Sequence, residues 1–144
     1  FSRQNLPFVS RDAAQIDGIK KGGYVLRDAV SPRAVLIATG SEIELALKAQ
    51  DALAAEGIAV RVVSMPSTNV FDRQDRAYRQ AVLGGDLPRV AIEAGVTGLW
   101  HKYVGLDGAV VALDRFGESA PAKVLFDTLG FTVAHVTDAV KSVL

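Results

Sequence analysis

The chain of 144 residues contains no cysteine, which excludes disulfide bonds and thiolate metal sites. This composition fits a reducing compartment, so we expect a cytoplasmic protein. Its only imidazoles, His101 and His135, are 34 positions apart and have no cluster of carboxylates beside them. A structural zinc site needs about four such ligands, so no metal site is expected.

Long apolar runs and blocks of like charge are also missing. The longest apolar runs, such as Ala34–Ala38 and Val90–Ile92, are far shorter than the roughly 20 residues needed to cross a bilayer. Sixteen basic residues balance sixteen acidic ones without a block of either sign. Neither a membrane nor a nucleic acid is therefore an expected partner. The chain opens at Phe1 without a signal segment, and we expect it to be part of a longer protein.

The sequence does contain enough apolar material for one domain. Hydrophobic residues make up 49% of the chain and charged residues 22%, which is typical of a compact domain with a substantial core. Residues 1–22 carry no sustained apolar period and include Pro7, Gly18 and Gly22. We therefore predict a linker arm over residues 1–22 and a domain over residues 23–144.

Strand-like and helix-like stretches alternate through the predicted domain. Apolar, β-branched runs predict strands over residues 24–28, 34–38, 58–64, 89–93 and 109–113. The first two are separated by a spacing that a hairpin turn accommodates, so the first would be an antiparallel edge strand. Helices are predicted from Ser41 to about Gly57, from about Asp72 to Leu83, from near Pro121 to Gly130 and from Thr132 to Val143. This order predicts a three-layer α/β domain whose mostly parallel sheet has about five strands, one of them antiparallel, and helices on both faces.

The start of the first long helix is also a candidate anion site. Ser41 and Glu44 have the spacing of a capping box, and Gly57 suits the left-handed end of the helix. The turn Thr39–Glu42 joins a strand's carboxyl end to a helix's amino end, where backbone N–H groups attract anions. It lacks the glycine pattern of dinucleotide folds and P-loops, so we favour simple capping.

Two further segments allow a structural and a functional interpretation. Gly117–Pro121 matches only part of the serine hydrolase elbow, so Ser119 is better explained as a helix N-cap before an early proline. The segment Trp100–Gly108 combines aromatic residues, charges and glycines. It is either a corner of the core or the rim of an interface or pocket, and the sequence leaves both open.

Five stretches, taken together, resemble transketolases. They occur in the family's order and span the whole chain: Ser2–Pro7, Ala38–Glu42, Val63–Ser67, Lys102–Gly105 and Arg115–Pro121. Carboxy-terminal domains of related thiamine-diphosphate enzymes share the fold but look less similar. The resemblance identifies the chain as the carboxy-terminal domain of a transketolase.

The resemblance implies what the parent enzyme does. Transketolases transfer a two-carbon ketol group from a ketose phosphate to an aldose phosphate through thiamine diphosphate, held with Mg²⁺ or another divalent cation. The cofactor lies between the first two domains of opposite subunits, so this chain would hold no catalytic, cofactor-binding or metal-binding residue. Its implied partners are those preceding domains, a second identical subunit and sugar phosphates. Alone, the chain would be inactive and would support the dimer.

The resemblance also implies one substrate contact. In the family, the arginine of the segment that matches Ser2–Pro7 contacts the substrate phosphate, and it corresponds to Arg3. A guanidinium can give a phosphate two parallel charged hydrogen bonds, which suits this role. Without the resemblance, Arg3 would be interpreted as a solvated linker residue.

Two other functions remain open on the residues alone. One is a stand-alone ligand-binding or regulatory module that uses the crevice at the carboxyl ends of its strands, where open α/β sheets usually bind ligands. The other is a pure interaction domain. A related thiamine-diphosphate enzyme is a further alternative for the parent protein.

Overall fold

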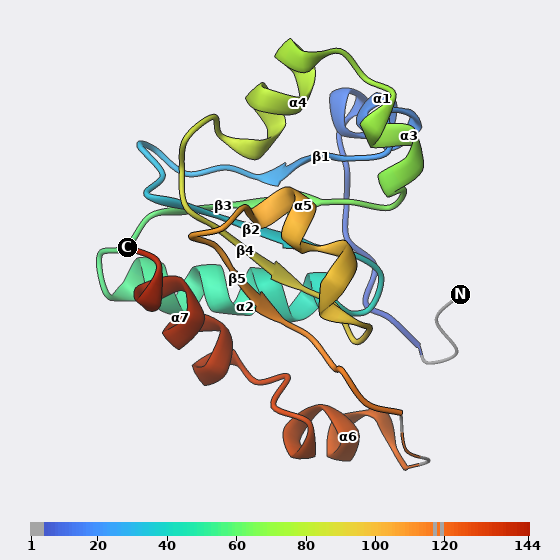
Figure 1. The fold of residues 1–144 in the computed structure, drawn as a ribbon, viewed down its shortest axis with the longest axis vertical. Helices are drawn as coiled ribbons and strands as arrows, with labels where there is room; N and C mark the ends of the chain where they lie inside the picture. Colours follow the sequence, from blue (N-terminus) through green and yellow to red (C-terminus); the bar gives the residue numbers. More distant parts are fainter. Residues whose placement is uncertain (1–4, 117, 119) are drawn as a thin grey trace.

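A five-stranded sheet lies between two layers of helices in the computed structural model (Figure 1), which describes residues 5–116, 118 and 120–144. The strands are β1 (Tyr24–Arg27), β2 (Ala34–Ala38), β3 (Val60–Ser64), β4 (Arg89–Ile92) and β5 (Ala109–Val111). All pairs are parallel except β1 with β3. The predicted three-layer α/β architecture with one antiparallel strand is confirmed.

The pairing of the edge strand β1 differs from the predicted hairpin. The sheet order is β1-β3-β2-β4-β5, so β1 lies beside β3 and not beside β2. The connection after β1 passes the start of β3, where the Arg33 N–H donates to the Ala59 carbonyl at 2.8 Å. Both edges of β2 are occupied by parallel neighbours, which leaves the half-buried β1 only the outer edge of β3.

Eight helical segments surround the sheet within the described residues. In chain order they are α1 (Ala13–Lys20), α2 (Glu42–Ala55), α3 (Thr68–Asp72), α4 (Arg76–Leu83), the 3₁₀ turn η1 (Thr97–Leu99), α5 (His101–Val104), α6 (Ala122–Thr128) and α7 (Val133–Ser142). The helix α1 was not predicted, because the arm shows no apolar period and only Gly18 of α1 is buried. A capping box between Asp12 and Gln15 starts it, and the Gln15 amide donates to the Leu26 carbonyl at 2.6 Å.

Two predicted helix starts are wrong in detail. Ser41 precedes α2 but does not cap it with its side chain, because its hydroxyl donates to the Glu42 carboxylate at 2.7 Å instead. Asp72 ends α3, whereas the N-cap of α4 is Asp75, whose carboxylate accepts from the Tyr78 N–H at 2.7 Å. The predicted left-handed residue after α2 is confirmed at Gly57, with φ of +78°.

The central strand β2 divides the core into two parts. All five of its residues are buried, as its uninterrupted apolar sequence predicts for a strand covered on both faces. Ala34, Leu36 and Ala38 face α2 and α7, which lie on one side of the sheet (Figure 1). Val35 and Ile37 face the residues of α3, α4 and α5 on the other side. The chain therefore covers both faces of its sheet with its own helices.

Candidate functional site

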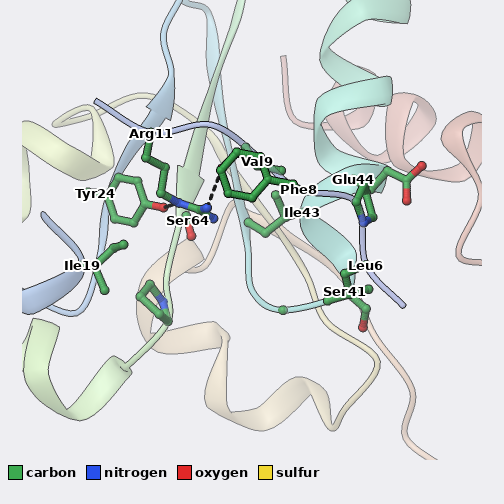
Figure 2. A pocket seen from close by; sticks show the side chains of 13 residues that line it. Leu6, Phe8, Val9, Arg11, Ile19, Tyr24, Ser41, Ile43, Glu44 and Ser64 are labelled. Carbon is green, nitrogen blue, oxygen red and sulfur yellow. Dashed lines mark hydrogen bonds between the residues drawn. The ribbon is translucent and has the colours of Figure 1, made fainter. Parts of the chain in front are cut away.

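A pocket lies between the amino-terminal arm and the carboxyl ends of β2 and β3 (Figure 2). Its volume is about 490 Å³. The arm contributes Leu6, Pro7, Phe8, Val9 and Arg11, and the facing wall comes from Ile19, Tyr24, Gly40, Ser41, Ile43, Glu44, Ser64 and Pro66. Carboxyl ends of parallel strands are the usual ligand-binding edge of an open α/β sheet, so this arm pocket is the first candidate site.

Arg11 ties the arm to the sheet. Its Nε donates to the hydroxyl oxygen of Tyr24 on β1 at 2.5 Å, and its Nη1 donates to the Val9 carbonyl at 2.8 Å (Figure 2). These bonds hold residues 9–11 against the edge of the sheet. The role of Arg11 could not be predicted from the sequence, because nothing near it indicates a partner thirteen positions later.

The side chains that line the arm pocket are better suited to holding the arm in place than to catalysis. Its polar side chains include Arg11, Ser41, Ser64 and Glu44. The Glu44 carboxylate accepts from Lys48 Nζ at 2.6 Å on the outer face of α2. The Ser41 hydroxyl donates to the buried Glu42 carboxyl group at 2.7 Å, and no histidine stands among the described lining residues. The pocket therefore holds the arm in place without the serine–histidine pair of a nucleophilic site.

A pair of carboxyl groups lies where β2 and β4 end. The connections from these neighbouring strands diverge, β2 leading to α2 and β4 to η1 and α5, which makes this the switch point of the sheet. Glu42 is 4% exposed, and burial raises the pKa of its carboxyl group, with the nearby Glu93 adding to the effect. The Glu93 carboxylate accepts the indole N–H of Trp100. The anion role considered for Thr39–Glu42 is therefore unfavourable, because a carboxyl group occupies the turn.

We predict that Glu42→Gln stabilises the chain at neutral pH and has little effect in acid. The folded carboxyl group has a pKa above its ordinary 4.5, so ionisation above that pH costs the folded state more than the unfolded chain. The stability of the parent chain therefore falls as the pH rises through the folded pKa. Glutamine cannot ionise and avoids this loss. Urea unfolding of parent and variant at pH 7 and pH 4 measures the difference.

Glu44→Gln is the matched control for this pH prediction. It removes a carboxylate from the same helix, but this group is more exposed and bonded to Lys48. It should give no gain at pH 7. Equal gains from both substitutions would mean that the effect is the overall charge of α2, and a pH-independent gain at position 42 would contradict the titration argument.

The structure also locates the other residues that the sequence suggested as functional candidates. Trp100 and Tyr103 are 1% and 3% exposed and belong to the core beneath α5, as the core interpretation of Trp100–Gly108 predicts. His135 Nδ1 lies 2.8 Å from the Gly130 carbonyl at the start of α7, while His101 is exposed on α5. In the described part of the chain, no three histidine, aspartate or glutamate side chains gather as metal ligands.

Two sequence candidates lie outside the described residues. Arg3, the predicted phosphate contact, precedes the first described residue, Asn5, and Ser119, the predicted N-cap, falls between described positions. Pro121 occupies the cap position of α6. Over residues 5–116, 118 and 120–144, no helix is both long and apolar enough to cross a membrane.

Comparison with known proteins gives one consistent result. Residues 22–132 match the family model of the transketolase-like TK C-terminal domain. Transketolase 1 of Vibrio parahaemolyticus is 56% identical over the whole chain, and transketolase 1 of Pasteurella multocida is 55% identical. In both cases the chain spans 22% of the relative's length.

Solved structures agree with the sequence comparison. A transketolase from Pichia stipitis superposes on 98% of the chain with a TM-score of 0.88 and 36% identity, and the match covers 20% of that protein. A transketolase from Leishmania mexicana superposes on 89% of the chain, or 18% of its own, with a TM-score of 0.82 and 42% identity. Because the model of the transketolase-like C-terminal domain covers most of the chain and the curated relatives are 55–56% identical along all of it, the chain belongs to the transketolase family and is its carboxy-terminal domain.

Proposed function

We propose that this chain is the last domain of an enzyme that transfers a two-carbon ketol group from a ketose phosphate to an aldose phosphate. The main support for this proposal is that the chain is 55–56% identical in sequence, over its entire length, to proteins named transketolase. The full-length protein is then a transferase that uses thiamine diphosphate and a divalent cation in the cytoplasm. Residues 1–22 form the linker from the preceding domain, and residues 23–144 form the carboxy-terminal domain.

The role of this domain in substrate binding rests on its arm. The Arg11 contacts direct the arm along the carboxyl edge of the sheet toward Asn5, two positions after Arg3. We assign Arg3 to the phosphate of the sugar substrate, because a guanidinium fork matches phosphate geometry. Related solved structures contain the transketolase of Pichia stipitis with xylulose-5-phosphate and with sedoheptulose-7-phosphate, which supports sugar phosphates as the ligand class.

The domain also supports an assembly with the preceding domains and a second identical subunit. Several large apolar side chains of the described residues face solvent, among them Phe8 at 91%, Phe116 at 97% and Leu106 at 103% exposure. Contiguous exposed apolar patches mark surfaces that partners cover, and we assign these side chains to such contacts with the preceding domains or the second subunit. One similar structure, 30% identical with a TM-score of 0.72, is described as a split-gene transketolase in an inactive beta4 tetramer.

The cofactor does not fit the side chains of this domain. The described residues offer no three-ligand cluster for a divalent cation, and the arm pocket carries Glu44, which would repel a diphosphate. We therefore assign thiamine diphosphate to the preceding domains and derive no catalytic step from this chain. Its own residues bind and position.

We predict that the isolated 144-residue chain neither transfers ketol groups nor binds thiamine diphosphate measurably. Within the described residues, no cluster of His, Asp or Glu side chains is present to hold a divalent cation and, through it, the diphosphate. Calorimetric titration with thiamine diphosphate and Mg²⁺, and a coupled assay with xylulose 5-phosphate and ribose 5-phosphate, measure both properties.

The full-length protein is the control for this prediction and tests the proposed function. It should bind the cofactor and transfer ketol groups in the same assays. A full-length protein that holds the cofactor yet converts no sugar phosphate would overturn the proposed activity. Micromolar binding to the isolated chain would instead show that the cofactor is wrongly assigned to the other domains.

A further inference from the structure

A second hollow, rich in basic side chains, lies between α4 and α5 on the face of the sheet opposite α2. Its volume is about 320 Å³, in the range that suits a small ligand. Its charged lining comes from three helices, from the loop after α4 and from the start of β4: Asp72, Arg76, Arg79, Asp86, Arg89 and Lys102. We call it the basic hollow. It shares no lining residue with the arm pocket.

One carboxylate of the basic hollow is already fully engaged. Asp72 accepts from Lys102 Nζ at 2.6 Å and from the Tyr103 hydroxyl at 3.0 Å. Burial, together with this bond to Asp72, raises the pKa of Tyr103 to about 12, so its hydroxyl stays a donor. Lys102 is therefore paired with Asp72, and Asp72 also lies close enough to Arg79 for the two charges to attract each other.

Arg89 places a fixed positive charge at the base of the hollow. Its guanidinium donates to three backbone carbonyls, those of Leu83 at 3.0 Å, Tyr103 at 3.1 Å and Gly85. Carbonyls fix the orientation of the group but do not cancel its charge. Among the described residues Arg89 forms no ion pair, so the nearby Asp86 only partly offsets it.

The observation that points to a ligand concerns the side chain of Arg79. Its side chain is half-buried, and its Nε is buried without a hydrogen-bond partner in the described part of the chain. Buried donors are nearly always bonded, so the acceptors of the described residues leave this guanidinium unsatisfied at Nε. Arg76 lies three positions earlier on the same face of α4 and also lines the hollow. Arg76 and Arg79 therefore line the hollow together with Arg89.

We propose that the basic hollow binds the phosphate group of a small phosphomonoester. Four cations against two carboxylates leave a net charge of about +2, which matches a phosphate dianion. Arg79 and Arg76 supply the paired donors, and the fixed charge of Arg89 adds attraction from below. The hollow shares no residue with the contact assigned to Arg3, and phosphate binding there can be measured on this chain whether or not the proposed catalytic function holds.

The test is a titration of the 144-residue chain, which contains both parts of the hydrophobic core. Inorganic phosphate and glycerol 3-phosphate are added at low ionic strength, and two-dimensional ¹H–¹⁵N spectra follow the amides of α4 and α5. We expect saturable shifts there with both probes, and about tenfold weaker binding for Arg79→Gln, since one charged fork is lost. The affinity of Arg79→Lys should fall between that of the parent chain and that of Arg79→Gln.

Arg73→Gln is the matched control. Arg73 is exposed near the start of α4, its Nε donates to the Asn69 carbonyl at 3.1 Å, and it does not line the hollow. It should keep the parent affinity. If Arg79→Gln fails to give a cooperative melt, Arg76→Gln decides in its place, with the same expected loss. Unsaturable shifts, equal losses from positions 73 and 79, or binding of phosphate but not of the ester would each overturn the proposal.

Discussion

Ile37→Asp is expected to abolish the folded state of the chain. Ile37 is the fourth of the five residues of β2 and is fully buried, opposite Val63 of β3 and Ala91 of β4. An ionised carboxylate at this place loses its hydration and finds no partner, a change that costs more than about 4 kcal/mol. A domain of this size has roughly 5–15 kcal/mol of stability in total. Thermal melting followed by circular dichroism measures the loss.

Two substitutions make the Ile37 experiment specific. Ile37→Val removes one methylene group without adding charge and should cost only about 0.5–1.5 kcal/mol. Val30→Asp introduces the same carboxylate at a side chain that is 92% exposed, and should change stability by no more than about 0.5 kcal/mol. A cooperative melt of Ile37→Asp near the parent temperature would mean that β2 is not buried on both faces.

The sequence predicted the sheet better than it predicted the pairing of its strands. An uninterrupted apolar run such as Ala34–Ala38 indicates burial on both faces by local composition alone. The neighbour of β1 depends on long-range competition, because β2 and β3 are both apolar enough to accept it. Only the parallel pairing of β2 with β3 and β4 decides that outcome. Local spacing therefore suggested a hairpin that does not form.

The structure of the arm was harder to predict, because it is held by contacts with residues that are far away in the sequence. The helix α1 buries only Gly18, so no apolar stripe marks it in the sequence. Its capping box at Asp12 and Gln15 is a local signal that the prediction overlooked. The tie between Arg11 and Tyr24 leaves no pattern at all, since neither residue type is unusual where it stands.

The basic hollow shows the same limitation. Its arginines come from α4 and from the start of β4, and its lysine comes from α5, spread over residues 76–102 without a block of like charge. Overall neutrality hides such a site, because acidic residues elsewhere balance the count. Only the packing of α4 and α5 on one face of the sheet brings these charges together.

Three of the segments that carry the family resemblance meet at the arm pocket, and Ser2–Pro7 contributes Leu6 and Pro7 to it. Ala38–Glu42 follows β2 and Val63–Ser67 ends β3, and the parallel register places Ala38 opposite Ser64. Ser41, Ser64 and Pro66 from these segments line the pocket that the arm covers. Residues that identify the family therefore hold the segment that leads back to Arg3.

Arg3→Ala, made in the full-length enzyme, is expected to lower kcat/KM for phosphorylated sugars by roughly ten- to two-hundredfold. Loss of one charged contact typically costs about 1.5 to 3 kcal/mol, which corresponds to that range. An unphosphorylated donor or acceptor never makes the contact, so its kcat/KM should change little. Steady-state kinetics with matched phosphorylated and unphosphorylated substrates measure the selectivity.

Arg3→Lys and Arg11→Ala separate phosphate recognition from damage to the arm. Lysine keeps the charge but not the fork, so it should recover only part of the loss. Arg11→Ala removes the bonds to Tyr24 and Val9 that hold the arm, and should impair both substrate classes alike. If Arg3→Ala behaves like Arg11→Ala, Arg3 supports the junction and does not bind the phosphate. If Arg3→Ala changes neither class, Arg3 is a solvated linker residue, and the role inferred from the family does not hold for this chain.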